Sequence, residues 1–444
     1  MKTTENLTSL GKYYGGDIMS TVDTVIEFIR KQAMEHPEKS WGKITAGFKA
    51  NKIKTKFLPN KNLSKGYQQL ENMMMSLIAD SLGKENSYVW GNIFAPCEIM
   101  NCFNLKTISI ECMSCYLSGY HLEDFFIDWA QDLGIAPTLC SYHKTFVGAV
   151  ESGVVKVPSY AITTSLTCDG NLNTFRYFQK TKGVPFTLLD VPYEKDEASI
   201  QYLADQMREL TQRLSEQTGI PFQEEMLREQ IHIENETRKE LKKFLKLLMI
   251  HRYPGQIISY LYLMMGMHLL IGTKEFLELV RFLVKDIQTY EKFEGKKILW
   301  VHLLPYYQES LQEYFNGNNK YQLIPSDMVL DYTGILDEEH PFEALAEKTI
   351  ENLYNGSYAH KAEILCKFAE DLHVDGVIHF CHWGCKQASG GSILLKEEMK
   401  QHHIPMLILD GDGIDRRNSH DGQIKTRLEA FLEMIDDDGG STTC

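Results

Sequence analysis

Apolar residues along the chain follow two different spacings, and the changes between them divide it into four parts. In the first part, residues 1–85, they recur at the spacing of one helix face over 21–35 and again over 67–82. The lysine-rich stretch 49–65 between these segments is expected to be an exposed connection. The pattern therefore predicts a helical N-terminal arm.

A different pattern begins at residue 86, where short apolar runs alternate with helical segments. In the part 86–195 we expect helices over 120–133 and 173–181 and strands over 87–91, 107–110, 160–166 and 183–190. The alternation returns in the part 294–444, with helices over 392–402 and 422–435 and strands over 297–302, 374–380 and 404–410. Strands that alternate with helices form a parallel sheet with right-handed crossovers. The sequence therefore predicts an α/β protein with two Rossmann-like parallel-sheet domains.

Between these two parts, residues 196–293 are almost purely helical and form a helical middle segment. We expect helices over 197–217, 223–250 and 256–290, the first of them stopped at Thr218-Gly219-Ile220-Pro221. The most apolar run, 257–271, is shorter than the about 20 residues that a membrane span needs, and it carries His268. It predicts a buried helix in a segment that links or buttresses the two domains. A weak internal repeat, an apolar run from Pro to Asp in 183–190 and 404–410, is consistent with two similar domains.

Composition and charge narrow the class of protein. The formal net charge of −14 over 444 residues argues against a nucleic-acid partner and against binding to an anionic membrane surface. It leaves small anionic ligands open, because helix N-termini bind them. The N-terminus lacks the apolar core of a signal peptide, so the ten cysteines are expected to be reduced thiols in a cytoplasmic protein.

Three of the cysteines have settings that suggest a metal site. Cys385 follows the apolar strand-like run 374–380 and precedes Ser-Gly-Gly, Cys168 follows the run 160–166, and Cys140 opens a helix-like run. Interpreted as strand-end thiols, they are expected to converge, because open α/β sheets bind ligands at the carboxyl ends of their strands. Three thiolates can hold a [4Fe–4S] cluster with one iron open for a ligand. The competing interpretation is burial as small apolar side chains.

The remaining cysteines carry weaker signals. We expect Cys102, Cys366, Cys381 and Cys444 to be core residues, and Cys97 to lie near a site without binding a metal. Cys112 and Cys115 have redox or zinc spacing, but a lone CxxC pair is a weak indication of either.

A spaced set of short motifs from about residue 85 to 440 carries a family resemblance. The later motifs are Val374-Asp375-Gly376-Val377, Cys385-Lys386, Ser389-Gly390, Ile404-Pro405, Asp410-Gly411-Asp412, Asp415-Arg416-Arg417-Asn418, Gly422-Gln423, Thr426-Arg427 and Glu429-Ala430-Phe431. The earlier motifs are Phe94-Ala95-Pro96-Cys97-Glu98, Leu139-Cys140-Ser141-Tyr142, Cys168-Asp169, Val184-Pro185 and Asp190-Val191-Pro192-Tyr193. In these residues the chain resembles the 2-hydroxyacyl-CoA dehydratase D-component family, which includes subunits of benzoyl-CoA reductase.

The resemblance implies an iron–sulfur subunit of a radical 2-hydroxyacyl-CoA dehydratase, a lyase of anaerobic amino acid fermentation. It implies that Cys140, Cys168 and Cys385 bind one [4Fe–4S] cluster, whose open iron binds the acyl-CoA substrate. One-electron reduction of the thioester gives a ketyl radical anion that expels the 2-hydroxyl of an (R)-2-hydroxyacyl-CoA. The implied partners are a homologous second dehydratase subunit and an ATP-dependent iron–sulfur activator protein. The chain has no GxxxxGK[ST] motif, in line with ATP hydrolysis on a separate protein.

Two alternatives stay open within this resemblance. The chain could be a subunit of a benzoyl-CoA-type reductase, or a non-catalytic electron-relay or assembly subunit that carries a cluster. In catalytic family members a serine-rich turn precedes the Pro-Cys-Glu motif, whereas the stretch 90–94 reads Trp-Gly-Asn-Ile-Phe. A substrate-shaped pocket beside an open iron would favour the enzyme, and a fourth protein ligand would favour the relay.

Glu98 is the residue best matched to proton transfer or hydroxyl handling, because it follows Pro96-Cys97 near a strand end. The competing interpretation is an acid in the first turn of a helix, which complements the helix dipole. Asp410, Asp412, Arg416 and Arg417 are expected to form a salt-bridged loop or to help position a cluster or CoA. We expect His382, His402 and His403 at the surface or in packing.

Overall fold

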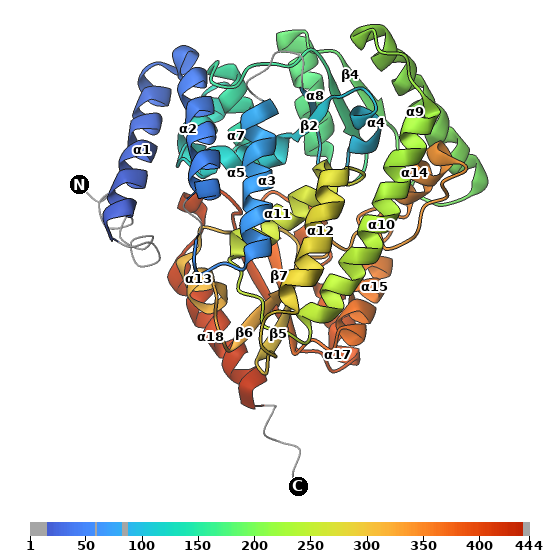
Figure 1. Cartoon of the computed structure of the whole chain (residues 1–444). Helices are drawn as coiled ribbons and strands as arrows, with labels where there is room; N and C mark the ends of the chain where they lie inside the picture. Colours follow the sequence, from blue (N-terminus) through green and yellow to red (C-terminus); the bar gives the residue numbers. More distant parts are fainter. Residues whose placement is uncertain (1–15, 58–59, 82–87, 438–444) are drawn as a thin grey trace.

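The computed structural model describes residues 16–57, 60–81 and 88–437, and within them it has two four-stranded parallel sheets (Figure 1). The first sheet joins its strands in the order β2-β1-β3-β4, with β1 (Tyr88–Gly91), β2 (Lys106–Ser109), β3 (Ala161–Thr164) and β4 (Phe186–Leu189). The second has the order β6-β5-β7-β8, with β5 (Lys296–Val301), β6 (Tyr321–Ile324), β7 (Gly376–His382) and β8 (Met406–Gly411). The predicted fold class, α/β with two Rossmann-like parallel-sheet domains, is confirmed. We call the two sheets with their covering helices the first and the second lobe.

Both sheets share one strand order, and it fixes where a ligand can bind. In each, the chain passes from its first strand to one neighbour and then crosses to the opposite side. The crossing places β3 beside β1, where Trp90 pairs with Ala161, and β7 beside β5, where Val301 pairs with His379. Open α/β sheets bind ligands at this reversal of direction, outside the carboxyl ends of the strands. The loops after β1, β3, β5 and β7 are therefore the places to look for a site.

Helices cover the sheets and fill the space between the lobes (Figure 1). In chain order, the helices of the described residues are α1 (Gly16–Glu35), α2 (Pro37–Phe57), α3 (Lys65–Ser81), α4 (Cys97–Asn101), α5 (Ile110–Ser118), α6 (Glu123–Asp132), α7 (Ser141–Glu151), α8 (Asp169–Lys182), α9 (Glu197–Thr218), α10 (Glu224–Leu248), α11 (Ile257–Leu269), α12 (Lys274–Ile287), α13 (Glu309–Phe315), α14 (Pro341–Ile350), α15 (Tyr358–Asp371), α16 (Lys386–Ser389), α17 (Ser392–Gln401) and α18 (Asp421–Asp437). Helices α1 to α3 lie in the part of the chain that was predicted as an N-terminal arm, and α9 to α12 lie in the predicted helical middle segment.

Two sequence predictions about the helices are wrong. The expected exposed connection 49–65 is helical up to Phe57, as the end of α2, because lysine is a good helix former; residues 58–59 lie outside the described residues. The expected helix 256–290 is two helices, α11 and α12. Gly272 between them has a φ of +83°, and the Thr273 hydroxyl then accepts a hydrogen bond from the Phe276 N–H at 3.4 Å. A left-handed glycine followed by an N-cap residue ends one helix and starts the next.

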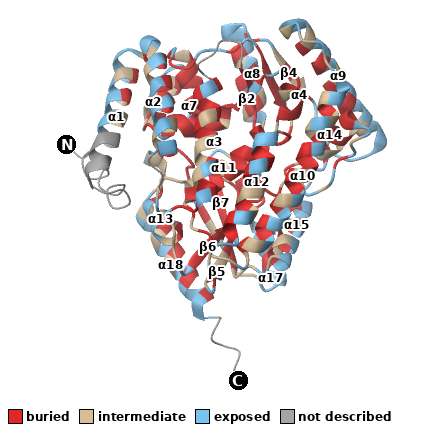
Figure 2. Ribbon diagram, viewed as in Figure 1, coloured by how far each residue is buried: buried red, intermediate tan, exposed pale blue. Residues whose placement is uncertain are grey.

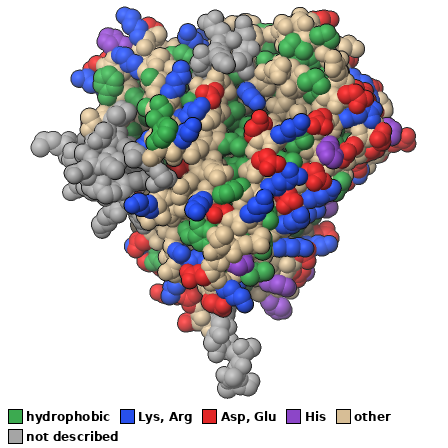
Figure 3. All heavy atoms as spheres, in the orientation of Figure 1, with side chains coloured by type: hydrophobic (Ala, Val, Ile, Leu, Met, Phe, Trp, Pro, Cys, Tyr) green, Lys and Arg blue, Asp and Glu red, His purple; other side chains and the backbone are tan. Residues whose placement is uncertain are grey.

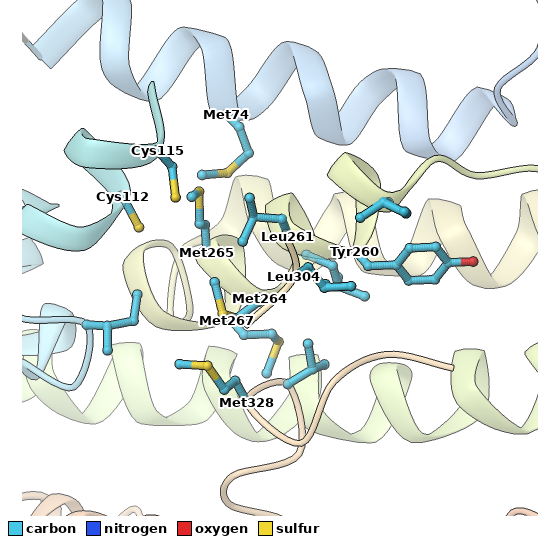
Figure 4. Close-up of a cluster of buried hydrophobic side chains, with 14 of the residues drawn as sticks. Met74, Cys112, Cys115, Tyr260, Leu261, Met264, Met265, Met267, Leu304 and Met328 are labelled. Carbon is cyan, nitrogen blue, oxygen red and sulfur yellow. The ribbon is translucent and has the colours of Figure 1, made fainter. Parts of the chain in front are cut away.

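One hydrophobic core extends through both lobes. It includes Trp90 on β1 and Trp300 on β5, which are 0% and 1% exposed, and Figure 2 shows buried residues following the strands and the inner faces of the helices. Between the lobes lies α11, whose methionines meet side chains from α3, α5 and the second lobe (Figure 4). Methionine side chains adapt to such irregular spaces. The apolar run 257–271 is thus a buried helix and its flanking turn, as the sequence predicts.

The outer surface is polar over the middle segment. Acidic and basic side chains are interspersed along α10 (Figure 3), where Arg228 pairs with Glu224 and Lys243 with Glu240, each at 2.8 Å. Such pairs stabilise an exposed helix only modestly. Among the helices of the described residues, none combines the length and the apolar character needed to span a bilayer.

Candidate functional site

The three predicted ligand cysteines each precede a helix. Cys140 is the N-cap residue of α7, Cys168 of α8 and Cys385 of α16. Burial raises the pKa of all three thiols, that of Cys168 to about 12, and backbone N–H groups in the first turn act in the opposite direction. Tyr142 supplies such an N–H to Cys140, Asn171 to Cys168 and Ala388 to Cys385. Each sulfur therefore lies where N–H groups stabilise the charge of a thiolate.

Two of the cysteines follow strands, but the prediction that all three do is wrong. Cys168 comes after β3 and Cys385 after β7, at the two positions where the strand order reverses. Cys140 lies between α6 and α7, with no strand directly before it in this described stretch. The turn that ends α6, with Gly134 at a φ of +91°, redirects the chain so that Cys140 starts the next helix.

The three thiols converge although they come from both lobes. The second lobe packs tightly against the first at Gly384, where an added Cβ would lie 2.7 Å from the Cα of Cys140. Gly384 has a φ of +83°, so this contact depends on the absence of a side chain. The charges of Cys168 and Cys385 both act on Cys140 and raise its pKa further. The structure thus brings together the residues that the sequence predicted as ligands.

A buried histidine lies against each of these cysteines, and no sequence pattern indicated this set. The Nε2 atom of His382 is 3.1 Å from the Cys140 sulfur, that of His143 is 3.5 Å from Cys168, and that of His302 is 3.6 Å from Cys385. These histidines are at most 5% exposed. The prediction of a surface or packing role for His382 did not foresee its contact with a thiol.

The donor set fits an iron–sulfur cluster by its chemistry. Within the described ranges, no three His, Cys, Asp or Glu side chains form a group that could hold one metal ion. The ligands of a [4Fe–4S] cluster do not need to meet at one ion, because each thiolate binds a different iron of the cluster. Cys140, Cys168 and Cys385 are free thiols, and thiolates are the soft ligands that such clusters use.

The other cysteines are placed in the core, with one exception. Cys97, Cys102, Cys366 and Cys381 are all buried. Figure 4 shows Cys112 and Cys115 beside Met74 and Met265 in the apolar cluster between the lobes, and both are buried. Cys444 lies outside the described residues.

Glu98 lies in a pocket of its own, in the first turn of α4. It is 1% exposed and forms an ion pair with Lys348 of α14, whose Nζ atom also lies 2.9 Å from Glu234 of α10. The Oε2 atoms of Glu98 and Glu234 are buried without a hydrogen-bond partner among the described residues. The pocket is also lined by Phe94, which follows β1, and by Leu166 on the loop that leads to Cys168.

Glu98 and Glu234, which share Lys348 as an ion-pair partner, differ in their affinity for a proton. Burial raises the pKa of Glu98 to about 7, against the attraction of Lys348. Burial would also raise the pKa of Glu234, but Lys348 and Arg238 outweigh it and lower that pKa to about 2. Neighbouring groups whose environments push their pKa values apart can divide acid and base roles between them. Glu98 is therefore the member that can gain or lose a proton near neutral pH.

The raised pKa of Glu98 predicts how stability depends on pH. The native state keeps a proton on Glu98 that the unfolded chain releases above its ordinary pKa of 4.5. This contribution to stability is complete below pH 4.5 and is lost as the pH rises through about 7. Urea unfolding from pH 4.5 to 8 should therefore show wild type losing stability relative to Glu98→Gln. Parallel pH profiles for the two proteins would contradict the assignment.

The charged loop after β8 connects the lobes beside Cys140. Asp412 accepts a hydrogen bond of 2.6 Å from the hydroxyl of Ser141, the residue after Cys140. Arg416 forms an ion pair with Glu123 of α6, and Arg417 one of 2.7 Å with Asp128. These contacts support the predicted salt-bridged loop, and they hold the second lobe against the helix that Cys140 starts.

The chain is similar in sequence to known proteins. The model of the family described as 2-hydroxyglutaryl-CoA dehydratase, D-component, matches residues 92–435. The (R)-phenyllactyl-CoA dehydratase alpha subunit of Clostridium sporogenes is 21% identical over 77% of this chain and 87% of its own length. The lactoyl-CoA dehydratase subunit alpha of Anaerotignum propionicum is 23% identical, over 78% and 90%. One benzoyl-CoA reductase subunit of Thauera aromatica is 21% identical, over 79% and 88%.

The family match covers most of the chain and includes Glu98 and the three converging cysteines. The relatives named above align with more than three quarters of the chain, at low identity. The chain belongs to the 2-hydroxyglutaryl-CoA dehydratase D-component family.

Proposed function

We propose that this chain is a subunit of a radical 2-hydroxyacyl-CoA dehydratase, in which Cys140, Cys168 and Cys385 hold one [4Fe–4S] cluster. The observation that carries the proposal is the convergence of these thiols from both lobes, each at a helix N-terminus. Relatives named as alpha and beta subunits of one dehydratase support a homologous partner subunit. The electron donor we propose is a separate ATP-dependent activator protein.

The cluster, when bound, would supply one-electron chemistry and a Lewis-acidic iron to the thioester of an (R)-2-hydroxyacyl-CoA. The residues of the chain perform the remaining tasks. Backbone N–H groups of the first turns of α7, α8 and α16 stabilise the thiolate charges of the three cysteines. Phe94 and Leu166 add apolar surface to the Glu98 pocket on the side of the Cys168 loop, which shields the buried carboxyl group from water.

Glu98 would move the proton in this reaction. Its Oε2 atom has no hydrogen-bond partner in the described structure, and a pKa of about 7 suits exchange of a proton near neutral pH. Lys348 and Arg238 keep Glu234 ionised beside it. This arrangement supports a catalytic subunit over a relay, because a pocket with an ionisable acid lies next to the Cys168 loop.

Anaerobic reconstitution of the wild-type chain tests the proposal. We expect about four irons and four sulfides per chain. The EPR spectrum of the reduced protein should change on addition of (R)-lactoyl-CoA or (R)-phenyllactyl-CoA, because an open iron can bind the substrate. A complete cluster whose EPR spectrum does not change on addition of either compound would favour the relay role. A chain that binds no iron, or only zinc, would contradict the proposal.

A further inference from the structure

The hydrogen bond between His382 and Cys140 has a defined donor and a defined acceptor. His382 is the last residue of β7 and is 0% exposed. Its Nδ1 atom accepts a hydrogen bond of 2.9 Å from the backbone N–H of Gly413. Its Nε2 atom lies 3.1 Å from the sulfur of Cys140. The ring of Tyr142 packs edge-on against the imidazole, with centroids 5.3 Å apart, and holds its orientation.

The Gly413 contact fixes which nitrogen of His382 carries the proton. A backbone N–H is only a donor, so the Nδ1 atom that it meets must present a lone pair. A neutral imidazole has a single N–H, which must then be on Nε2, facing the sulfur. The Cys140 sulfur therefore receives an N–H hydrogen bond from a buried side chain in the other lobe.

His143 lies against Cys168 within the first lobe, but its neighbours do not fix a donor. The Nε2 atom of His143 lies 3.5 Å from the sulfur, and its Nδ1 atom lies 3.1 Å from the Thr174 hydroxyl, which can donate or accept. Gly170 makes room for the ring, since an added Cβ there would lie 2.9 Å from Nε2.

Cys385 differs from the other two cysteines. The Nδ1 atom of His302 lies 3.2 Å from the carbonyl oxygen of Phe380, which can only accept. In the neutral ring the proton is therefore on Nδ1, and the Nε2 atom that faces the Cys385 sulfur has none. Of the three sulfurs, only that of Cys140 has a side-chain N–H donor whose direction a backbone contact fixes.

We propose that His382 is a positioning residue that donates an N–H hydrogen bond to the sulfur of Cys140 and so raises the reduction potential of the group that this sulfur helps to hold. Hydrogen bonds to the sulfurs are one of the factors that set the potential of an iron–sulfur cluster. A donor stabilises the reduced form more, because reduction adds negative charge. The effect on potential rests on the proposed function, whereas the hydrogen bond does not.

The first test needs no metal. The full chain, kept reduced and free of iron, is labelled with 15N-histidine, and long-range proton–nitrogen NMR spectra are recorded. The His382 signals are identified by their loss in His382→Phe. We expect Nε2 to carry the proton and Nδ1 to have the shift of an unprotonated nitrogen. The opposite tautomer in wild type would overturn the proposal, whether or not the chain binds a cluster.

The second test measures the midpoint potential of the reconstituted chain. The potential depends on how much stronger the hydrogen bond becomes on reduction, so its loss in His382→Phe should lower the equilibrium constant for reduction by up to about fivefold to tenfold. A tenfold change is about 59 mV for a one-electron couple, here toward more negative potential. His382→Gln, whose amide can donate to the sulfur and accept from Gly413, should recover much of the shift.

His379→Phe is the matched control for this test. His379 is also on β7 and 0% exposed, but its ring contacts Cys381, at 3.9 Å, and not a proposed ligand. It should keep the wild-type potential. An unchanged potential in a fully loaded His382→Phe chain would overturn the proposal. A wild-type chain without iron would refute the proposed function and leave the NMR result to decide the hydrogen bond.

Discussion

Replacing Cys140, Cys168 or Cys385 by alanine, one at a time, should remove most of the iron and the visible absorption of the anaerobically reconstituted chain. Each thiol comes from a different helix N-terminus, so a neighbouring cysteine cannot take its place without moving a helix. Two remaining protein ligands would leave half of the irons of a [4Fe–4S] cluster without one. Iron and sulfide analysis of the three variants beside wild type measures the effect.

Cys381→Ala is the control for this series. Cys381 lies on β7, four positions before Cys385 in the chain, and is 6% exposed. Because it faces the core, its loss should leave the iron content close to that of wild type. Full iron in all three ligand variants, or loss of iron in Cys381→Ala, would show that the ligand assignment is wrong.

Lys348→Met should produce the largest loss of stability among substitutions in the Glu98 pocket. Lys348 pairs with both Glu98 and Glu234, which are 1% and 0% exposed. Removal of one partner from a buried ion pair typically costs about 3–5 kcal/mol, because the remaining charge is left uncompensated. Glu234 would keep its ion pair with Arg238, so the carboxyl that loses its partner is that of Glu98. We expect a fall of this size in the free energy of unfolding, measured by urea titration at pH 7.

Lys195→Met provides a matched control. Lys195 also bridges two glutamates, Glu347 and Glu351, the first of them a neighbour of Lys348 on α14. All three side chains are 40% exposed, and exposed pairs contribute about 0–1 kcal/mol. Equal losses in the two variants would mean that the pairing in the Glu98 pocket is no stronger than a surface salt bridge.

The sheets could be predicted because their strands are nearly continuous apolar runs. The central strand β7 is buried at every position, whereas the edge strand β8 is mostly half-buried and Asp410 on it is exposed. Strands that are covered on both faces take apolar residues at most positions. The strand β6 was not predicted. Its sequence, Tyr-Gln-Leu-Ile, is short and contains a buried glutamine whose amide donates to the carbonyl oxygen of Leu248 at 2.7 Å. A polar residue with a tertiary partner does not show in a pattern of apolar positions.

The three proposed ligand cysteines could be singled out from sequence, because helix starts and strand ends have local signals. The three histidines could not. His143 and His382 are 239 positions apart in the numbering of the chain, and no spacing relates either to the sulfur that it meets. For His382 and His302 the direction of the hydrogen bond depends on the second ring nitrogen, whose partner is a backbone N–H or carbonyl brought there by the fold. Such information exists only in three dimensions.

The origin of the cysteines in both lobes has a consequence for the order of maturation. Cys140 and Cys168 belong to the first lobe and Cys385 to the second, so the complete ligand set exists only after the lobes have folded and docked. A cluster that binds this docked form and not the separated one would stabilise it by mass action. The cluster would then be inserted late, and only into chains whose two lobes have folded and docked correctly. Its destruction by oxygen would remove a cross-link between the lobes as well as a reactive group.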